Sequence, residues 1–218
     1  MKIAEIKNIR QYCDMIGAET LHPLVNVVDF AALPPIRYIN LHRRVEYYAI
    51  YLKESKHTAL RYGHSVYDYE EGTLVFIAPG QVVGSEEDGE YHQVKGYALL
   101  FQPDLLQGTE LAQNMRRYSY FSYDIHEALH LTEQERSIFV DCLIHIQNEL
   151  RHYDEQSKYL ITDYIKLVLD FCVRFYDRQF KTRTIENNNV LARMEKLLDD
   201  YFLSSLPCLL YTSDAADE

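Results

Sequence analysis

The chain has 218 residues, of which 47% are hydrophobic and 25% charged, so it can build one sizeable core or a barrel with a small helical appendage. The formal net charge of −11 disfavours general attraction to a nucleic-acid backbone. The sequence contains no apolar stretch of membrane-spanning length and no basic-then-apolar leader, so we expect a cytoplasmic protein without membrane contacts.

The first half of the chain predicts a short helix followed by a β-rich region. The pattern between Ile6 and Ile16 favours a helix. From residue 24 to residue 104, short runs of Val, Ile, Tyr and Phe are separated by Pro and Gly, which is typical of an antiparallel sandwich or barrel. The expected strands are Val25–Phe30, Tyr47–Lys53, Leu60–Tyr69, Thr73–Ala78 and Tyr97–Phe101. Gly72 lies between two of these runs, where the positive φ of a tight hairpin favours glycine.

The second half of the chain has helical spacing. Thr132 and Glu135 form the pattern of a capping box, and apolar residues then recur at the period of a helix. A second helix is expected at residues 156–180, and the short loop between the two predicts an antiparallel hairpin. We interpret the charged residues 178–189 as a linker before a third helix at Val190–Phe202. The predicted fold class is therefore α+β.

The residue pattern gives little support to metal or catalytic chemistry. His64 stands alone, and no histidine follows the turn at Pro79-Gly80, whereas a transition metal needs three or four ligands at one place. The cysteines form no C-x-x-C pair; they are Cys13, Cys142, Cys172 and Cys208. Of these, we expect Cys142 and Cys172 to be buried thiols. Motifs of serine hydrolases, phosphate-binding loops and zinc proteases are missing. We expect no metal, no cofactor and no enzymatic activity.

Aromatic and histidine side chains of the β-rich region are candidates for contacts with a small molecule. Alternation along the strand places Tyr62 and His64 on one face and Tyr67 on the other, and the sequence leaves open which face points inward. We expect a ligand cavity inside the barrel, with Tyr48, Tyr62, His64 and Tyr67 as candidate lining residues. The alternative is that these side chains serve only the packing and hydrogen bonding of the sheet.

Several stretches resemble known proteins. Residues 62–84, with the spacing from glycine 72 to proline 79, resemble a hairpin of the cupin barrel. Residues 96–106 (GYALLFQPDLL), 118–123 (YSYFSY) and 127–132 (EALHLT) resemble AraC-type transcription regulators, in particular a subgroup abundant in Bacteroidetes. Gln102 departs from the resemblance, because relatives often carry histidine before the Pro-Asp pair.

The resemblance implies a cupin-like jelly-roll barrel that senses an effector over residues 1–131, and a helical dimerisation segment over residues 132–180. Residues 181–207 would hold a linker and the first helix of a DNA-binding domain whose helix-turn-helix units lie beyond this chain. Residues 208–218 have no periodicity and resemble a translated sequencing adapter, so we set them aside and expect the natural sequence to continue past Pro207.

A homodimer through the two helices is the expected assembly, with DNA contacted only through the missing domain. The candidate interface residues lie on the helical stripes and are Ile138, Cys142, Ile146, Tyr164, Val168, Phe171 and Phe175. The helices could instead bury these stripes on each other and on the barrel, which would leave a monomer. Two other functions stay open: a small cupin enzyme such as a sugar isomerase, which would need a metal, and a ligand-free structural dimerisation module.

Overall fold

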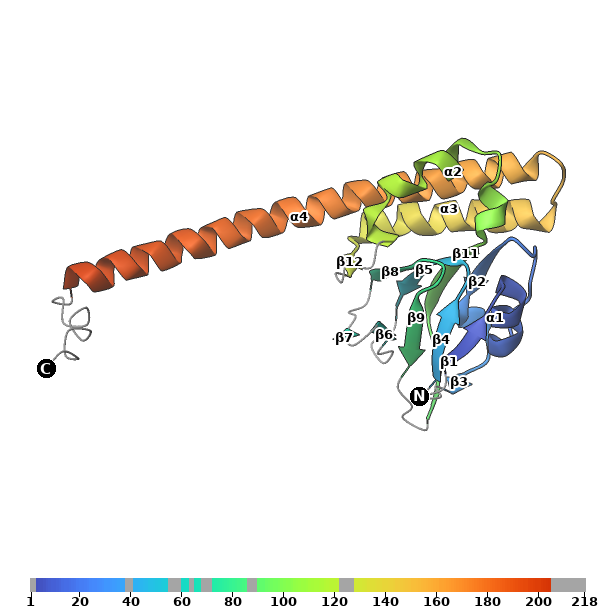
Figure 1. The fold of residues 1–218 in the computed structure, drawn as a ribbon, viewed down its shortest axis with the longest axis horizontal. Coiled ribbons are helices and arrows are strands. Elements are labelled where there is room, and N and C mark those ends of the chain that lie inside the picture. Colours follow the sequence, from blue (N-terminus) through green and yellow to red (C-terminus); the bar gives the residue numbers. More distant parts are fainter. Residues whose placement is uncertain are drawn as a thin grey trace, which may run out of the picture. The chain divides into compact units, whose positions relative to one another are not determined.

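A computed structural model describes seven segments of the chain, which are residues 3–37, 41–54, 60–62, 65–67, 72–85, 90–121 and 128–204. Residues 1–175 and 176–218 form two separate units, and every strand of the described segments lies in the first unit. The architecture is α+β, as the sequence predicts, with two larger sheets and two long helices that follow the last strand in the chain (Figure 1).

One five-stranded sheet, here called the central sheet, is antiparallel throughout. Its strands, in spatial order, are β12 (Leu129–His130), β8 (Thr73–Ile77), β5 (Tyr48–Lys53), β11 (Gly96–Phe101) and β2 (Val25–Asp29). The predictions for β2, β5, β8 and β11 are confirmed to within one residue at each end. Strand β12 is too short for its alternation to be visible in the sequence.

A second five-stranded sheet, here called the outer sheet, contains several strands that we did not predict. Its order is β1 (Ile3–Ile6), β4 (Leu41–Val45), β9 (Val82–Ser85), β6 (Leu60–Tyr62) and β7 (Ser65–Tyr67), with β1 parallel to β4 and the other pairs antiparallel. Strands β3 (Ile36–Arg37) and β10 (Tyr91–His92) form a separate antiparallel pair. The three basic residues inside β4 hide its alternation, because no apolar residue separates them.

Three local predictions need correction. Residues 60–69 do not form one strand, because β6 and β7 form a short antiparallel pair. Gly72 has a φ of 83°, as expected, but it does not close a hairpin, since β7 and β8 belong to different sheets. Its N–H instead donates to the carbonyl of Lys53 at 2.8 Å. The first helix is α1 (Ile9–Ile16), which begins after β1 because the Asn8 side chain caps it by accepting from the N–H of Gln11 at 3.0 Å.

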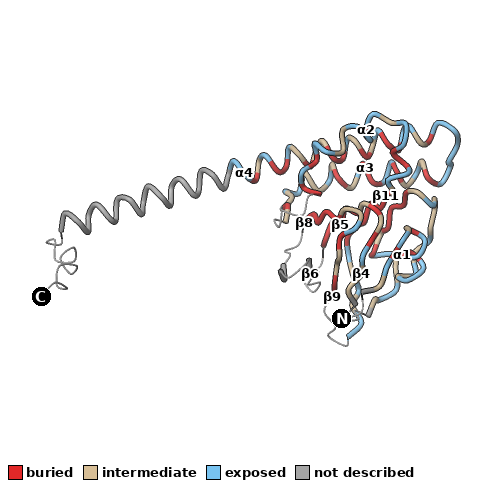
Figure 2. The backbone as a smooth tube through the Cα atoms, in the orientation of Figure 1, coloured by how far each residue is buried: buried red, intermediate tan, exposed pale blue. Residues whose placement is uncertain are grey.

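The central sheet is buried on both faces, which explains why its strands are apolar along their whole length. The face toward the outer sheet and α1 forms the core, with Val28, Ala49, Val75, Ile77, Ala98 and Leu100. The opposite face carries Val27, Ile50, Leu52, Leu74, Phe76, Leu99 and Phe101, all buried. Helix α3 (Glu133–Arg151) and the first part of α4 (Ser157–Ser204) lie over that face, with the short α2 (Glu110–Asn114) nearby (Figure 2). The central sheet therefore lies between two layers of buried apolar side chains.

The helical region confirms two predictions and corrects a third. Thr132 and Glu135 form the expected capping box at the start of α3, and Cys142 and Cys172 are buried free thiols. The linker expected at residues 178–189 and the separate third helix are not observed, because α4 runs unbroken from Ser157 to Ser204. No proline or glycine occurs between these ends. The three consecutive asparagines cost only about 0.7 kcal/mol each in helix propensity, which does not break a helix.

The Asp154 side chain accepts hydrogen bonds at the start of α4, which predicts a pH dependence of stability. Its carboxylate accepts from the N–H groups of Gln156 and Ser157 at 2.8 and 3.0 Å, and these bonds hold its pKa below the ordinary value of 3.8. A depressed carboxyl pKa stabilises the fold above the unfolded-state value, and that stability is lost as the pH falls through the folded-state value. We expect Asp154→Ala to lower the Tm at pH 7 and to have a smaller effect at pH 3. Thermal unfolding followed by circular dichroism checks this, and an equal effect at both pH values would argue against the cap.

Candidate ligand-binding site between the two sheets

Strand β4 carries an arginine toward the interior of the sandwich. Along this strand Arg44 is exposed and pairs with Glu46 at 2.7 Å and Glu5 at 3.9 Å, whereas the next residue, Val45, is buried in the core. Side chains alternate along a strand, so Arg43 lies on the same face as Val45. The antiparallel register pairs Arg43 with Val83 of β9, which packs against the same core. A basic side chain therefore points between the two sheets.

Three tyrosines from different elements surround this region. Tyr12 comes from α1, Tyr47 directly precedes β5, and Tyr51 follows four residues later on the same face of that strand. The ring centroids of Tyr12 lie 6.0 Å from Tyr47 and 6.3 Å from Tyr51, and Phe30 stacks on Tyr51 at 6.3 Å. We call Tyr12, Arg43, Tyr47 and Tyr51 the tyrosine–arginine cluster. It replaces part of the aliphatic packing expected inside a small sandwich.

Two polar atoms of the cluster are buried without a hydrogen-bond partner. In the described part of the chain, the buried side-chain atoms in this condition are Thr20 Oγ1, Arg43 Nε and the Tyr47 hydroxyl. The Tyr51 hydroxyl lies close enough to influence the pKa of Tyr47, but no hydrogen bond of acceptable geometry joins them. Buried donors are nearly always paired, so unpaired donors gathered in one place indicate that something else meets them.

The charges of the cluster are fixed at physiological pH. Burial raises the pKa of Tyr12, Tyr47 and Tyr51 above the ordinary value of 10.0, while the nearby Arg43 opposes this shift at each of the three. All three phenols are therefore neutral near pH 7, and Arg43 is positive. The cluster consequently offers several donors and one positive charge. No carboxylate of the described segments forms an ion pair with Arg43; the acidic partners found there belong to Arg44, Arg136 and Lys166.

The unpaired hydroxyl of Tyr47 predicts an unusual effect on stability. Because an unsatisfied buried hydroxyl costs about 1–3 kcal/mol, Tyr47→Phe should raise the free energy of unfolding by about 1 kcal/mol. Tyr120→Phe is the matched control, since the Tyr120 hydroxyl is buried but donates to the carbonyl of Leu169 at 2.9 Å, and its loss should lower that free energy by about 1 kcal/mol. Urea unfolding of both variants decides the point. Equal losses in the two would show that the Tyr47 hydroxyl is already satisfied.

Of the four residues predicted to line a ligand cavity, the structure describes the side chain of Tyr48 alone. Tyr48 lies on the face of the central sheet opposite the cluster, stacked on Phe101 and edge-on to Phe121 with centroids 5.0 Å away in both cases. The register places Tyr62 opposite Val83, but the side chains of Tyr62 and Tyr67 lie outside the described part of the structure, as does all of His64. Sequence reasoning missed Tyr12, Arg43, Tyr47 and Tyr51. The Tyr47–Tyr51 spacing, which puts both on one face of a strand, was the available signal.

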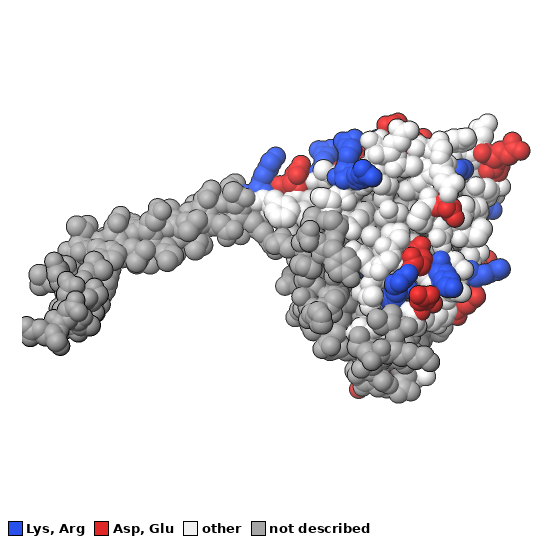
Figure 3. All heavy atoms as spheres, viewed as in Figure 1, with Lys and Arg blue, Asp and Glu red and all other residues white. Residues whose placement is uncertain are grey.

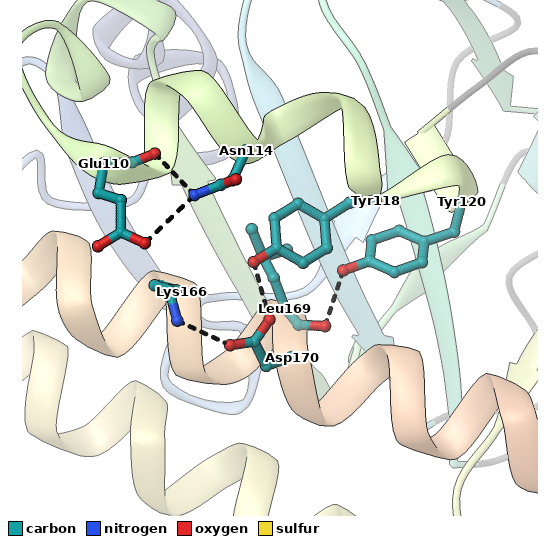
Figure 4. A network of polar contacts seen from close by, with 7 residues as sticks. All are labelled: Glu110, Asn114, Tyr118, Tyr120, Lys166, Leu169 and Asp170. Atoms are coloured by element: carbon teal, nitrogen blue, oxygen red, sulfur yellow. Dashed lines mark hydrogen bonds and ion pairs between the residues drawn. The ribbon is translucent and has the colours of Figure 1, made fainter.

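A network of polar contacts joins the segment after α2 to α4 (Figure 4). The Tyr118 hydroxyl donates to Asp170 Oδ1 at 2.9 Å, and Lys166 pairs with Asp170 Oδ2 at 3.0 Å. Next to it is the bond from Tyr120 to the carbonyl of Leu169. Burial and the neighbouring Asp170 raise the pKa of Tyr118, which keeps the phenol protonated as a donor. The turn at residues 118–121 is thus attached directly to α4.

The same turn is also attached to the sheets. Phe76 of β8 packs on Tyr120 with ring centroids 4.3 Å apart. Gln81 is buried in the connection from β8 to β9, and its side-chain amide donates to the backbone carbonyl of Phe121 at 3.3 Å. The backbone carbonyl of Gln81 accepts from the N–H of Val45 of β4 at 3.1 Å. A continuous set of contacts therefore connects the strand that carries Arg43 with α4.

The predicted dimer residues divide into two groups. Cys142, Ile146, Val168 and Phe175 are buried within their own chain. Ile138, Tyr164 and Phe171 keep part of their surface exposed, and Tyr164 stacks on His145 of α3 with centroids 5.2 Å apart. The largest exposed apolar side chains on the same part of α4 are Tyr159, Leu160 and Leu167. Leu160, Tyr164, Leu167 and Phe171 lie at helical spacing along one face, which we call the helix stripe.

Comparison with known proteins leaves the family open. No protein-family model matches the chain, and no curated protein matches it.

In the described segments, no group of three or more His, Cys, Asp or Glu side chains is arranged to hold a metal ion. The helices in those segments also lack a stretch long and apolar enough to cross a membrane.

Proposed function

We propose that this chain is the effector-sensing and dimerisation part of an AraC-type transcription regulator. The observation that carries the proposal is the position of the central sheet. One of its faces borders the tyrosine–arginine cluster, with buried donors that lack partners, and the other face is covered by a helical hairpin. A molecule bound between the sheets would contact the same sheet on which the helices pack.

The strand connections support a cupin-like jelly roll. Eight strands taken in chain order, β2, β4, β5, β6, β7, β8, β9 and β11, alternate between the two sheets except at the step from β6 to β7. The central sheet then reads β8-β5-β11-β2 and the outer sheet reads β4-β9-β6-β7. This order agrees with the two interlocked Greek keys of an eight-stranded jelly roll. The agreement is independent of the sequence stretches that resemble AraC-type regulators.

The contacts at residues 118–121 support a route from ligand to helix. A ligand can change the helices only if it has different interaction free energies with two arrangements of the protein. Arg43 and Gln81 are linked through β4, and Gln81 contacts the turn that Tyr118 and Tyr120 fasten to α4. Movement of β4 toward a bound molecule would therefore be felt at α4. We infer that this turn couples the barrel to the helices.

The helix stripe supports the dimer. Leu160 and Leu167 are 47% and 42% exposed, and they alternate with the partly exposed aromatic side chains of Tyr164 and Phe171. An apolar stripe along a helix suits an isologous contact with a second copy of the chain. DNA binding, in this proposal, belongs to a domain outside this chain. Both basic and acidic side chains lie on the face shown in Figure 3.

The proposal is tested on the whole chain by two measurements. Sedimentation equilibrium should give a dimer mass at micromolar concentration, and a thermal-shift screen of small molecules should find compounds that raise the Tm. A metal-dependent isomerase activity would favour the cupin enzyme instead. A dimer that no compound stabilises would favour the structural dimerisation module.

A further inference from the structure

The cluster between the sheets also carries information about the chemical class of its ligand. The relevant observations are the orientation of Arg43, the unpaired Arg43 Nε and Tyr47 hydroxyl, and the rings of Tyr12, Phe30 and Tyr51 around them. Since the cluster is the effector site of the function proposed above, this inference rests on that function. It adds the chemical class of the molecule that the site binds.

Arg43 is partly buried, and its buried Nε needs a partner that accepts a hydrogen bond. Because the guanidinium also carries a positive charge, a carboxylate suits it best, since it forms charge-assisted bonds to the planar fork of an arginine. The described segments supply no such carboxylate to Arg43. Lys53, another basic residue that is buried at the end of β5, has an interaction of its own and is therefore not an unpaired cation. The acceptor for Arg43 is therefore expected from a bound molecule.

The tyrosines favour an anion over a neutral polyol. A guanidinium has five donors and no acceptor, and a neutral phenol next to an anion turns its proton toward it. The Tyr47 hydroxyl, which has no hydrogen-bond partner within the protein, would gain an acceptor from an anion beside Arg43. The aromatic rings provide apolar surface for the body of the ligand. We propose that the tyrosine–arginine cluster binds a small organic carboxylate, with its carboxyl group on Arg43 and Tyr47 and its apolar part against Tyr12, Phe30 and Tyr51.

The test uses the whole chain and matched pairs of probes. The carboxylates are acetate, succinate, benzoate and 4-hydroxybenzoate, each compared at equal ionic strength with its neutral amide, and inorganic phosphate is the comparison anion. We expect at least one carboxylate to raise the Tm by several degrees while its amide does not. Arg43→Gln and Tyr47→Phe should each weaken binding at least tenfold by calorimetry. Arg44→Gln, a change on the same strand but on the solvent side, should leave binding unchanged, and Arg43→Lys should retain part of it.

The outcomes separate the ligand class from the proposed function. If amides or neutral sugars stabilise the protein and lose this effect in Arg43→Gln, the site is a sensor but its ligand is not a carboxylate. If only phosphate stabilises it, or if the carboxylates act equally on wild type and Arg43→Gln, the carboxylate site is overturned. If no carboxylate changes the Tm of the wild type, this inference fails. Failure of the wider screen as well would count against the sensing function.

Discussion

Replacing Gly96 with alanine is expected to destabilise the protein by about 3–5 kcal/mol, the largest single effect that we anticipate. Gly96 begins β11, the strand between β5 and β2 in the central sheet, and it has a φ of 118°. A Cβ at this position would lie 2.0 Å from the carbonyl oxygen of Leu52, so the backbone of the neighbouring strand would have to move. Strain and steric clash act together here, because both the conformation and the space exclude a side chain.

Gly108 is the matched control for this substitution. It also has a positive φ, of 79°, but no atom lies within 4 Å of the position its Cβ would take. Gly108→Ala should therefore cost only the conformational strain, about 1–2 kcal/mol. Urea unfolding of both variants measures the difference between them. Equal costs at the two positions would contradict the close packing of β11 against β5.

Placing aspartates on the helix stripe is expected to break the dimer. The double variant Leu160→Asp, Leu167→Asp puts two charges on a surface that would be desolvated in the complex, so the dimer dissociation constant should rise at least about 100-fold, or about 3 kcal/mol. Because both side chains are more than two-fifths exposed, the fold of each protomer should survive the change. Sedimentation equilibrium gives the dissociation constant, and circular dichroism checks the helices.

Tyr91→Asp is the control for the helix stripe. Tyr91 lies on β10 and is 71% exposed, so the same kind of change is made at an apolar residue away from the helices. It should leave the dissociation constant unchanged. A double variant at Leu160 and Leu167 that still dimerises like the wild type would show that the protein pairs through another surface, or that the stripe serves no contact between copies.

The sequence predicted the parts of the fold in which one physical signal dominates. Strands β2, β5, β8 and β11 are apolar along their length because the sheet is covered on both faces, and the capping box at Thr132 is a local pattern. Strands β4 and β9 were not predicted, because their basic and small residues show no regular alternation of apolar and polar positions. The break expected near residue 178 was wrong because charged residues without proline or glycine do not end a helix.

The candidate site depended on contacts that no local pattern reveals. Tyr12 and Arg43 lie 31 positions apart in the sequence and meet Tyr47 only because α1 and β4 pack on the same core. The face on which Tyr48 lies follows from the register of β5 with β11, which a single sequence does not fix. An unpaired buried donor is likewise a property of the folded chain alone. The sequence could therefore suggest a tyrosine-rich β region but not the arginine between its two sheets.

The central proposal is that a ligand bound at the tyrosine–arginine cluster changes how the helices pair. By linkage, a ligand that alters dimerisation must bind the two association states with different affinities. The most direct test is the dimer dissociation constant, measured by sedimentation equilibrium with and without a saturating concentration of the carboxylate that raises the Tm most. We predict a change of at least about fivefold, corresponding to about 1 kcal/mol of coupling, and its disappearance in Arg43→Gln. An identical dissociation constant with and without the bound carboxylate would contradict the account.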